Sequence, residues 1–281
     1  MKRPFLPLAA ALILGGAGAV VRLWERRSAY DAAIGLTDLS SPAVWLLLIL
    51  TAAAVVMALV CARAMAHHPF PRGYDQAFYA PNSIYPTLLI LSAVAMLLSA
   101  GLAVLDYRND LMLYALGYVQ TSPSVLKIVL AALAVVSALC LFPIAKNGYR
   151  GTGRGNKFTP LLAPAFFACI WLVVSYQEDA ANPDMMSFLF GRMAAICAAL
   201  ALYYVSSFSF EKAKPGRTVF FSMPALFFSL VSLCDSGALF LKVISGSVVL
   251  LLSAQLGALC WNNSGEHVPH SDPSEVDTDE P

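Results

Sequence analysis

Residues 43–62 read AVWLLLILTAAAVVMALVCA, a run of twenty residues that contains no charged side chain. As an α-helix, with a rise of 1.5 Å per residue, this run is about 30 Å long, which is the thickness of the hydrocarbon core of a bilayer. The length of the run and its lack of charge predict a membrane-spanning helix.

Seven further apolar stretches of this kind occur along the chain. Together the eight predict an all-α fold, a polytopic transmembrane helical bundle, with spans at 5–23, 43–62, 84–105, 125–144, 158–176, 185–208, 219–233 and 238–261. The composition agrees, because 59% of the 281 residues are hydrophobic and only 12% are charged, whereas a soluble domain carries about 25% charged residues. The composition therefore excludes a soluble globular fold.

The Lys and Arg residues of the predicted loops indicate the orientation, because cytoplasmic loops are enriched in these residues. With the N-terminus in the cytoplasm, eleven of them fall on the inner side and four on the outer side. An even number of spans then places the C-terminus in the cytoplasm too, which predicts a multi-pass protein of the cell (plasma) membrane. In the alternative, residues 5–23 are a cleavable signal peptide with Ala17 and Ala19 near its cleavage site, and seven spans remain.

The two halves of the chain resemble each other, which indicates a duplication. Asp106 follows the third stretch and Asp235 the seventh, while Lys127 and Lys242 open the fourth and the eighth in the related contexts LKIV and LKVI. We predict a parallel four-plus-four repeat with residues 1–145 as the first four-helix unit and 146–261 as the second, followed by a disordered acidic cytoplasmic tail, 262–281. In the alternative, the helices resemble one another through their apolar composition alone.

Charged residues gather at the outer ends of the predicted spans. Lys127 and Lys242 lie in the first turns of spans that start outside, and Arg192 lies about 11 Å deep in the sixth stretch. The candidate substrate-binding residues are these three cations and the acids at the same level, Asp106, Glu178, Asp179 and Asp235. Charges within membrane helices usually face a protein interior or a water-filled cavity, so this layer predicts an outward-facing vestibule for an anionic solute, a zwitterion or a lipid headgroup.

A structural role for the same charges is the alternative. Both lysines then snorkel to the interface and pair with Asp106 and Asp235, while Arg192 forms a buried ion pair with Glu178 or Asp179. Between these charges, residues 106–124 contain the apolar segment DLMLYALGYV, which is too short to span a membrane. We expect this segment to lie flat at the outer interface.

The sequence contains no recognised catalytic motif, and its six cysteines form no CxxC pair or Cys/His cluster. We therefore expect a protein that is not an enzyme and has no cofactor and no metal site, and a net charge of +1 gives no reason to expect a nucleic-acid partner. The many spans and the intramembrane cations favour a transporter or channel-like protein for a small polar or anionic solute. The alternative is a non-catalytic membrane-embedded subunit, or an interaction or sensory protein of a larger complex, with a membrane protein partner in addition to the lipid bilayer; the small residues Ala11, Gly15 and Ala19 on one helix face support it.

Overall fold

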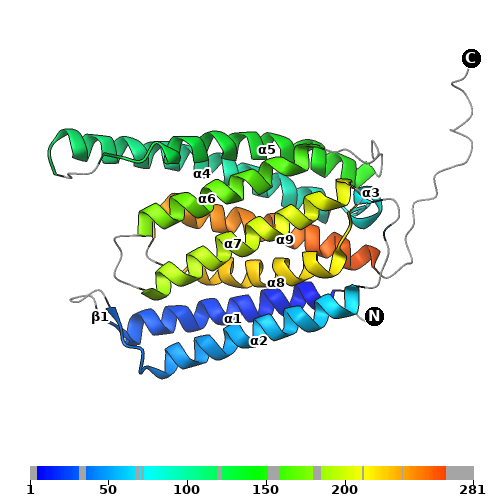
Figure 1. Ribbon diagram of the computed structural model, residues 1–281, viewed down its shortest axis with the longest axis horizontal. Coiled ribbons are helices and arrows are strands. Elements are labelled where there is room, and N and C mark those ends of the chain that lie inside the picture. The colour runs from blue at the N-terminus through cyan, green and yellow to red at the C-terminus, as the bar shows by residue number, and fades with distance from the viewer. Residues whose placement is uncertain are drawn as a thin grey trace, which may run out of the picture.

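The computed structural model describes residues 5–31, 36–66, 70, 73–118, 122–150, 159–179, 185–210, 212–235 and 237–263. Within these ranges, eight long helices alternate in direction along the chain (Figure 1). They are α1 (Leu6–Ser28), α2 (Pro42–Met65), α4 (Ile84–Ala115), α5 (Leu126–Arg150), α6 (Leu162–Asp179), α7 (Met185–Ser207), α8 (Pro215–Ser232) and α9 (Leu239–Asn262). The shorter elements are the antiparallel strands β1 (Tyr30–Asp31) and β2 (Leu36–Thr37), the helix α3 (Tyr74–Ala77) and the 3₁₀ turns η1 (Thr159–Leu161) and η2 (Phe208–Phe210).

Six of the long helices are long and apolar enough to cross a membrane, namely α1, α2, α4, α5, α7 and α9. The predicted all-helical bundle of membrane-spanning character is therefore confirmed. The predicted count of eight spans is supported for these six helices only, because α6 is apolar over a shorter length, Leu162–Glu178, and α8 is not among the candidate spans.

The helix α8 lies inside the bundle, where it packs against α1, α2, α7 and α9. Thirteen of its 18 residues are buried, and they include the polar residues Ser222, Ser229 and Ser232. Since helices rather than lipid surround α8, its surface does not have to be as apolar as the surface of a helix that faces lipid. This position accounts for the weaker membrane signal of α8.

The first four long helices do not pack as one unit. The pair α1 and α2 lies on one side of the bundle, the pair α4 and α5 lies on the other, and α6 to α9 lie between them (Figure 1). The predicted unit boundary at 145/146 falls inside α5. The four-plus-four repeat is not confirmed and stays a prediction, and the predicted tail lies outside the described residues from 264 onward.

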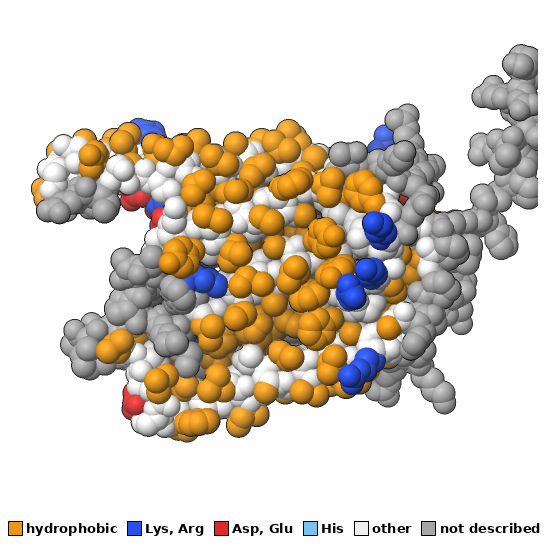
Figure 2. All heavy atoms as spheres, viewed as in Figure 1, with side chains coloured by type: hydrophobic (Ala, Val, Ile, Leu, Met, Phe, Trp, Pro, Cys, Tyr) orange, Lys and Arg blue, Asp and Glu red, His pale blue; other side chains and the backbone are white. Residues whose placement is uncertain are grey.

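We call the end of the bundle that holds Phe5 and Asn262 the proximal end, and the opposite end, with Ser28 and Leu126, the distal end. The described chain begins and finishes at the same end (Figure 1), as an even number of long helices requires. On the face seen in Figure 2, apolar side chains cover the middle, and Lys and Arg side chains gather toward the proximal end. Under the positive-inside rule this end is the cytoplasmic one, which remains a prediction.

The helix α4 is longer than the sequence predicts. It continues through Asp106 to Ala115, so its 32 residues extend about 48 Å, and its last turns reach beyond the other helices at the distal end (Figure 1). The expectation that this segment lies flat at the interface is wrong up to Ala115. The extension is held against α5 because Asp106 and Asp110, one turn apart on α4, both bind Lys127.

Replacing Gly216 with alanine is expected to destabilise the bundle. A Cβ atom at Gly216 would lie 2.8 Å from the backbone oxygen of Ala62 and 3.0 Å from Cβ of Ala66, so α8 would have to move away from α2. We expect Gly216→Ala to lower the free energy of unfolding by about 1–3 kcal/mol. The control is Gly101→Ala, which meets no heavy atom within 4 Å. The melting temperatures of the two variants in detergent test this prediction. Equal melting temperatures would contradict the close approach of α8 to α2.

Candidate functional site

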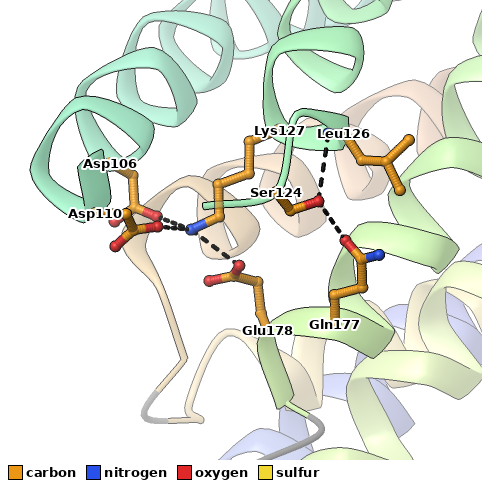
Figure 3. A network of polar contacts seen from close by, with 7 residues as sticks. All are labelled: Asp106, Asp110, Ser124, Leu126, Lys127, Gln177 and Glu178. Carbon is orange, nitrogen blue, oxygen red and sulfur yellow. Dashed lines mark hydrogen bonds and ion pairs between the residues drawn. The ribbon is translucent and has the colours of Figure 1, made fainter. Parts of the chain in front are cut away.

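A concentrated group of charges, the Lys127 cluster, lies at the distal end where α4, α5 and α6 meet. The ammonium nitrogen of Lys127 lies 2.7 Å from Oδ2 of Asp106, 2.5 Å from Oδ2 of Asp110 and 2.9 Å from Oε1 of Glu178. Figure 3 shows the Lys127 side chain pointing between these three carboxylates. The two aspartates come from one helix face of α4, and Glu178 comes from the last turn of α6.

Local hydrogen bonds fix the helix ends that carry this cluster. The hydroxyl of Ser124 accepts the backbone N–H of Leu126 at 3.3 Å, which occupies a donor that the first turn of α5 would otherwise leave unsatisfied. The same hydroxyl donates to Oε1 of Gln177 on α6 at 2.6 Å (Figure 3). The starting turn of α5 and the final turn of α6 are thereby tied together beside Lys127.

The charge of the Lys127 cluster is unbalanced. Three carboxylates and one ammonium group give a formal charge of −2. The Lys127 side chain is only 3% exposed, whereas the side chains of Asp106, Asp110 and Glu178 are 36%, 39% and 23% exposed. The ammonium group also lies over the ring of Phe240 on α9, 5.8 Å from its centroid. The part of the cluster that solvent reaches is therefore acidic.

A second charged group, the Arg22 cluster, lies at the distal ends of α1 and α8. Nη1 of Arg22 donates to Oε1 of Glu25 at 2.6 Å, and Nε donates to Oδ1 of Asp235 at 2.7 Å. Arg22 and Glu25 are fully buried and Asp235 is nearly so. The guanidinium group lies over the ring of Phe190 on α7. The cluster thus joins α1 to the turn after α8 across 213 positions of the sequence.

Arg192 of α7 is buried, and it binds Tyr176 of α6. Its Nη2 donates to the Tyr176 backbone oxygen at 3.1 Å, and the guanidinium carbon lies 4.7 Å from the centroid of the Tyr176 ring. The ion pair with Glu178 that the sequence suggested is not formed, because Glu178 binds Lys127 instead. Asp179, the other suggested partner, ends α6, and its side chain lies outside what the structure describes.

The predicted repeat makes Lys127 and Lys242 equivalent, but the two lysines differ in their partners. Lys127 binds Asp106, as the structural alternative predicted. The matching pair is not found, because Asp235 binds Arg22, and among the described residues Lys242 has no ion-pair partner. Lys242 is half-buried in the first turn of α9. The ion pairs thus place Lys127, Asp106 and Glu178 in one cluster and Asp235 in another, and the predicted shared vestibule stays a prediction.

The candidate residues from the sequence did not include Arg22, Glu25 or Asp110, although the sequence placed Asp110 in the same outer layer of acids. A signal for the first two was present, because the buried residues of α1 recur every three or four positions at Ala11, Gly15, Gly18, Arg22 and Glu25. The small-residue face that the sequence indicated at Ala11 and Gly15 thus continues into the Arg22 cluster through Gly18, whereas Ala19 is only half-buried.

The proximal end contains a polar group of a different kind. The hydroxyls of Tyr74 and Tyr85 lie 3.3 Å apart, and each lies 3.5 Å from Oε1 of Gln255 on α9. Burial raises the pKa of Tyr74, which lies in α3 outside the long helices, to about 12. The side-chain amide of Asn262 donates to the backbone oxygens of Ala77 and Tyr79, which attaches the end of α3 and the residues after it to the end of α9.

Within the described ranges, no three His, Cys, Asp or Glu side chains are arranged to hold a metal ion. Comparison with protein families, with curated proteins and with solved structures finds no match for this chain. The class of the protein therefore follows from its own structure. It is an integral membrane protein built as a bundle of apolar helices, with charged clusters at the distal end.

Proposed function

We propose that this protein is a membrane transporter or channel-like protein for a small cationic or zwitterionic solute that enters at the distal end. The observation that carries the proposal is a polar face on α4, where Tyr85, Ser92, Ser99 and Asp106 recur every seven residues. A spacing of seven keeps side chains on nearly one helix face. The 21 steps from Tyr85 to Asp106 rise about 32 Å, which is enough to cross the hydrocarbon core.

Polar groups on the neighbouring helices follow the same face. Ser92 donates to the backbone oxygen of Ser247 on α9 at 2.8 Å, and Tyr85 meets Gln255 further along α9. On α5, Ser137 is fully buried, and its hydroxyl has no hydrogen-bond partner among the described residues. Buried polar groups are normally hydrogen-bonded, so a hydroxyl in this state is a candidate contact for a passing solute. The interface of α4 with α5 and α9 supports a polar path between the two ends.

The charge of the Lys127 cluster supports a cation rather than the anion that the sequence alone favoured. Lys127 is neutralised by Asp106, and the further negative charge of Asp110 and Glu178 would repel an anion. A positively charged amine on a solute would instead find carboxylate oxygens open to water. The proposal therefore keeps the transport class and the zwitterion of the sequence-based interpretation and replaces the anion by a cation.

A thermal-shift assay of the purified protein with lysine, choline and glutamate tests the preferred charge. At a concentration 100 times Kd, a ligand stabilises the folded state by about 2.7 kcal/mol, which raises the melting temperature by about 5 °C in a chain of this size. We expect this shift with lysine or choline and not with glutamate. The double variant Asp110→Asn/Glu178→Gln should lose the shift, because only the balanced Lys127–Asp106 pair remains.

Asp38→Asn serves as the control, because Asp38 is an exposed acid of the distal β2–α2 turn. Its shift should equal that of the wild type. In vesicles, uptake of the stabilising amine should fall in Ser99→Val and persist in Thr87→Val, which changes an exposed position of the same helix. A larger shift with glutamate, or an unchanged shift in the double variant, would overturn the proposed cation site. No shift with any solute would favour the membrane-embedded subunit.

A further inference from the structure

An apolar groove of about 210 Å³ opens at the proximal end between α1, α4 and α9. All three helices are long and apolar enough to span a membrane. The ring of Phe5 lies 5.6 Å from the ring of Trp261 and closes one wall. Phe5 and residues from all three helices line the groove, among them Leu8, Tyr85, Leu88, Ala254 and Gly257.

The groove follows the helix direction through the depth of one leaflet. Along α9, its lining runs from Trp261 through Gly257 to Ser253, a rise of about 12 Å over eight residues. One leaflet of the hydrocarbon core is about 15 Å thick. Trp side chains are enriched at the level of the lipid headgroups, so Trp261 and the neighbouring Asn82 mark the mouth of the groove.

The size and charge of the surroundings fit one lipid chain. The groove has a volume of about 210 Å³ and follows α9 for about 12 Å, so it is narrow for its length, which suits part of a single acyl chain. Near the mouth, the backbone N–H of Ala80 donates to the oxygen of Gly148, which places the last turn of α5, with the exposed Arg150, beside the groove. A cation at this level complements a lipid phosphate.

We propose that this groove holds one acyl chain of a phospholipid from the leaflet at the proximal end. This inference does not depend on the proposed transport function. The residue that keeps the groove open is Gly257, where an added Cβ would already lie 3.4 Å from Cδ2 of Leu8. A leucine at position 257 would fill the groove, whereas the rest of the membrane-facing surface would be unchanged.

Quenching of Trp261 fluorescence by phospholipids brominated on the acyl chain tests the proposal. The full chain is reconstituted into phosphatidylcholine vesicles with increasing fractions of the brominated lipid. The substitutions Trp24→Phe and Trp45→Phe remove two exposed tryptophans, and the buried Trp171 serves as an internal reference. We expect a preference of at least about fivefold for the site over bulk lipid, the ratio that about 1 kcal/mol of groove contact would give.

Gly257→Leu should reduce the quenching of Trp261 to the level set by random lipid contact. Gly246→Leu is the matched control on the same helix, because a Cβ there meets only Leu233, at 3.9 Å, and its quenching should equal that of the wild type. If Gly257→Leu does not fold, Ser253→Leu replaces it, since Ser253 is half-buried in the same wall. Two results would overturn the proposal. The first is quenching of wild-type Trp261 at the level of random lipid contact. The second is cross-linking at position 261 that shows a dimer covering the groove in place of the lipid.

Discussion

Arg22→Leu is expected to lower the free energy of unfolding by about 3–5 kcal/mol, the usual cost of leaving a buried charge without its partner. The variant would leave the carboxylates of Glu25 and Asp235 buried beside each other in the distal core. Both acids would then have lost a hydrogen-bond donor as well as a positive charge. At about 2–4 °C for each kcal/mol, the melting temperature in detergent should fall by about 10 °C.

Arg27→Leu is the matched control for this variant. Arg27 lies in the same last turns of α1 but is exposed, and an exposed substitution usually changes stability by no more than about 0.5 kcal/mol. Replacing all three members of the Arg22 cluster by apolar residues should recover much of the loss, because buried ion pairs often exchange for apolar residues at little cost. A wild-type melting temperature in Arg22→Leu would show that the ion pairs do not hold α1 to the turn after α8.

Lys127→Met should be the second most damaging single change. It removes the one positive charge among Asp106, Asp110 and Glu178, and these three carboxylates then repel one another. We expect the free energy of unfolding to fall by about 2–4 kcal/mol. This loss does not exceed the usual cost of breaking a fully buried ion pair, because water reaches the three acids. Since the cluster joins α4, α5 and α6, the distal part of α4 should separate from α5. Hydrogen exchange of the backbone amides near Asp106 and Asp110 should therefore increase.

Lys242→Met provides the control for the Lys127 variant. Lys242 has the corresponding place at the start of α9, but no ion-pair partner among the described residues, so the expected loss is below about 1 kcal/mol. The substitution Asp106→Asn/Asp110→Asn in the Lys127→Met background should restore part of the lost stability. Equal effects at both lysines would contradict the structural difference between them and would support the predicted repeat.

The spans were predictable from local information. Each apolar run, such as residues 43–62, must form a helix because a bilayer leaves no other partner for its backbone N–H and C=O groups. The described part of each of the eight predicted stretches is helical except at end residues such as Phe5, Val125, Leu233 and Ala238, and six of the corresponding helices meet the requirements of a span. The distal extension of α4 was not predictable in the same way, because it depends on Asp106 and Asp110 meeting Lys127.

For the candidate site, the sequence predicted the end of the bundle at which the charged residues gather, but not how they pair. Charges in an apolar bundle are costly in lipid and collect where water or other charges are near, so the sequence indicated their distal position and the membership of Lys127, Asp106, Glu178 and Asp235. It did not indicate the excess of acid around Lys127. That excess arises because Glu178 comes from α6, whose approach to α5 is set by packing.

The sequence by itself determined that the chain is a membrane bundle, since hydrophobicity and span length are properties of each stretch alone. Only the tertiary structure decided which acid serves which cation. Asp235 lies seven positions from Lys242 but binds Arg22, 213 positions away, because the buried face of α1 continues through Gly15 and Gly18 to Arg22 and packs on α8. Ion pairs depend on distances of a few ångströms in three dimensions, and helix packing sets those distances.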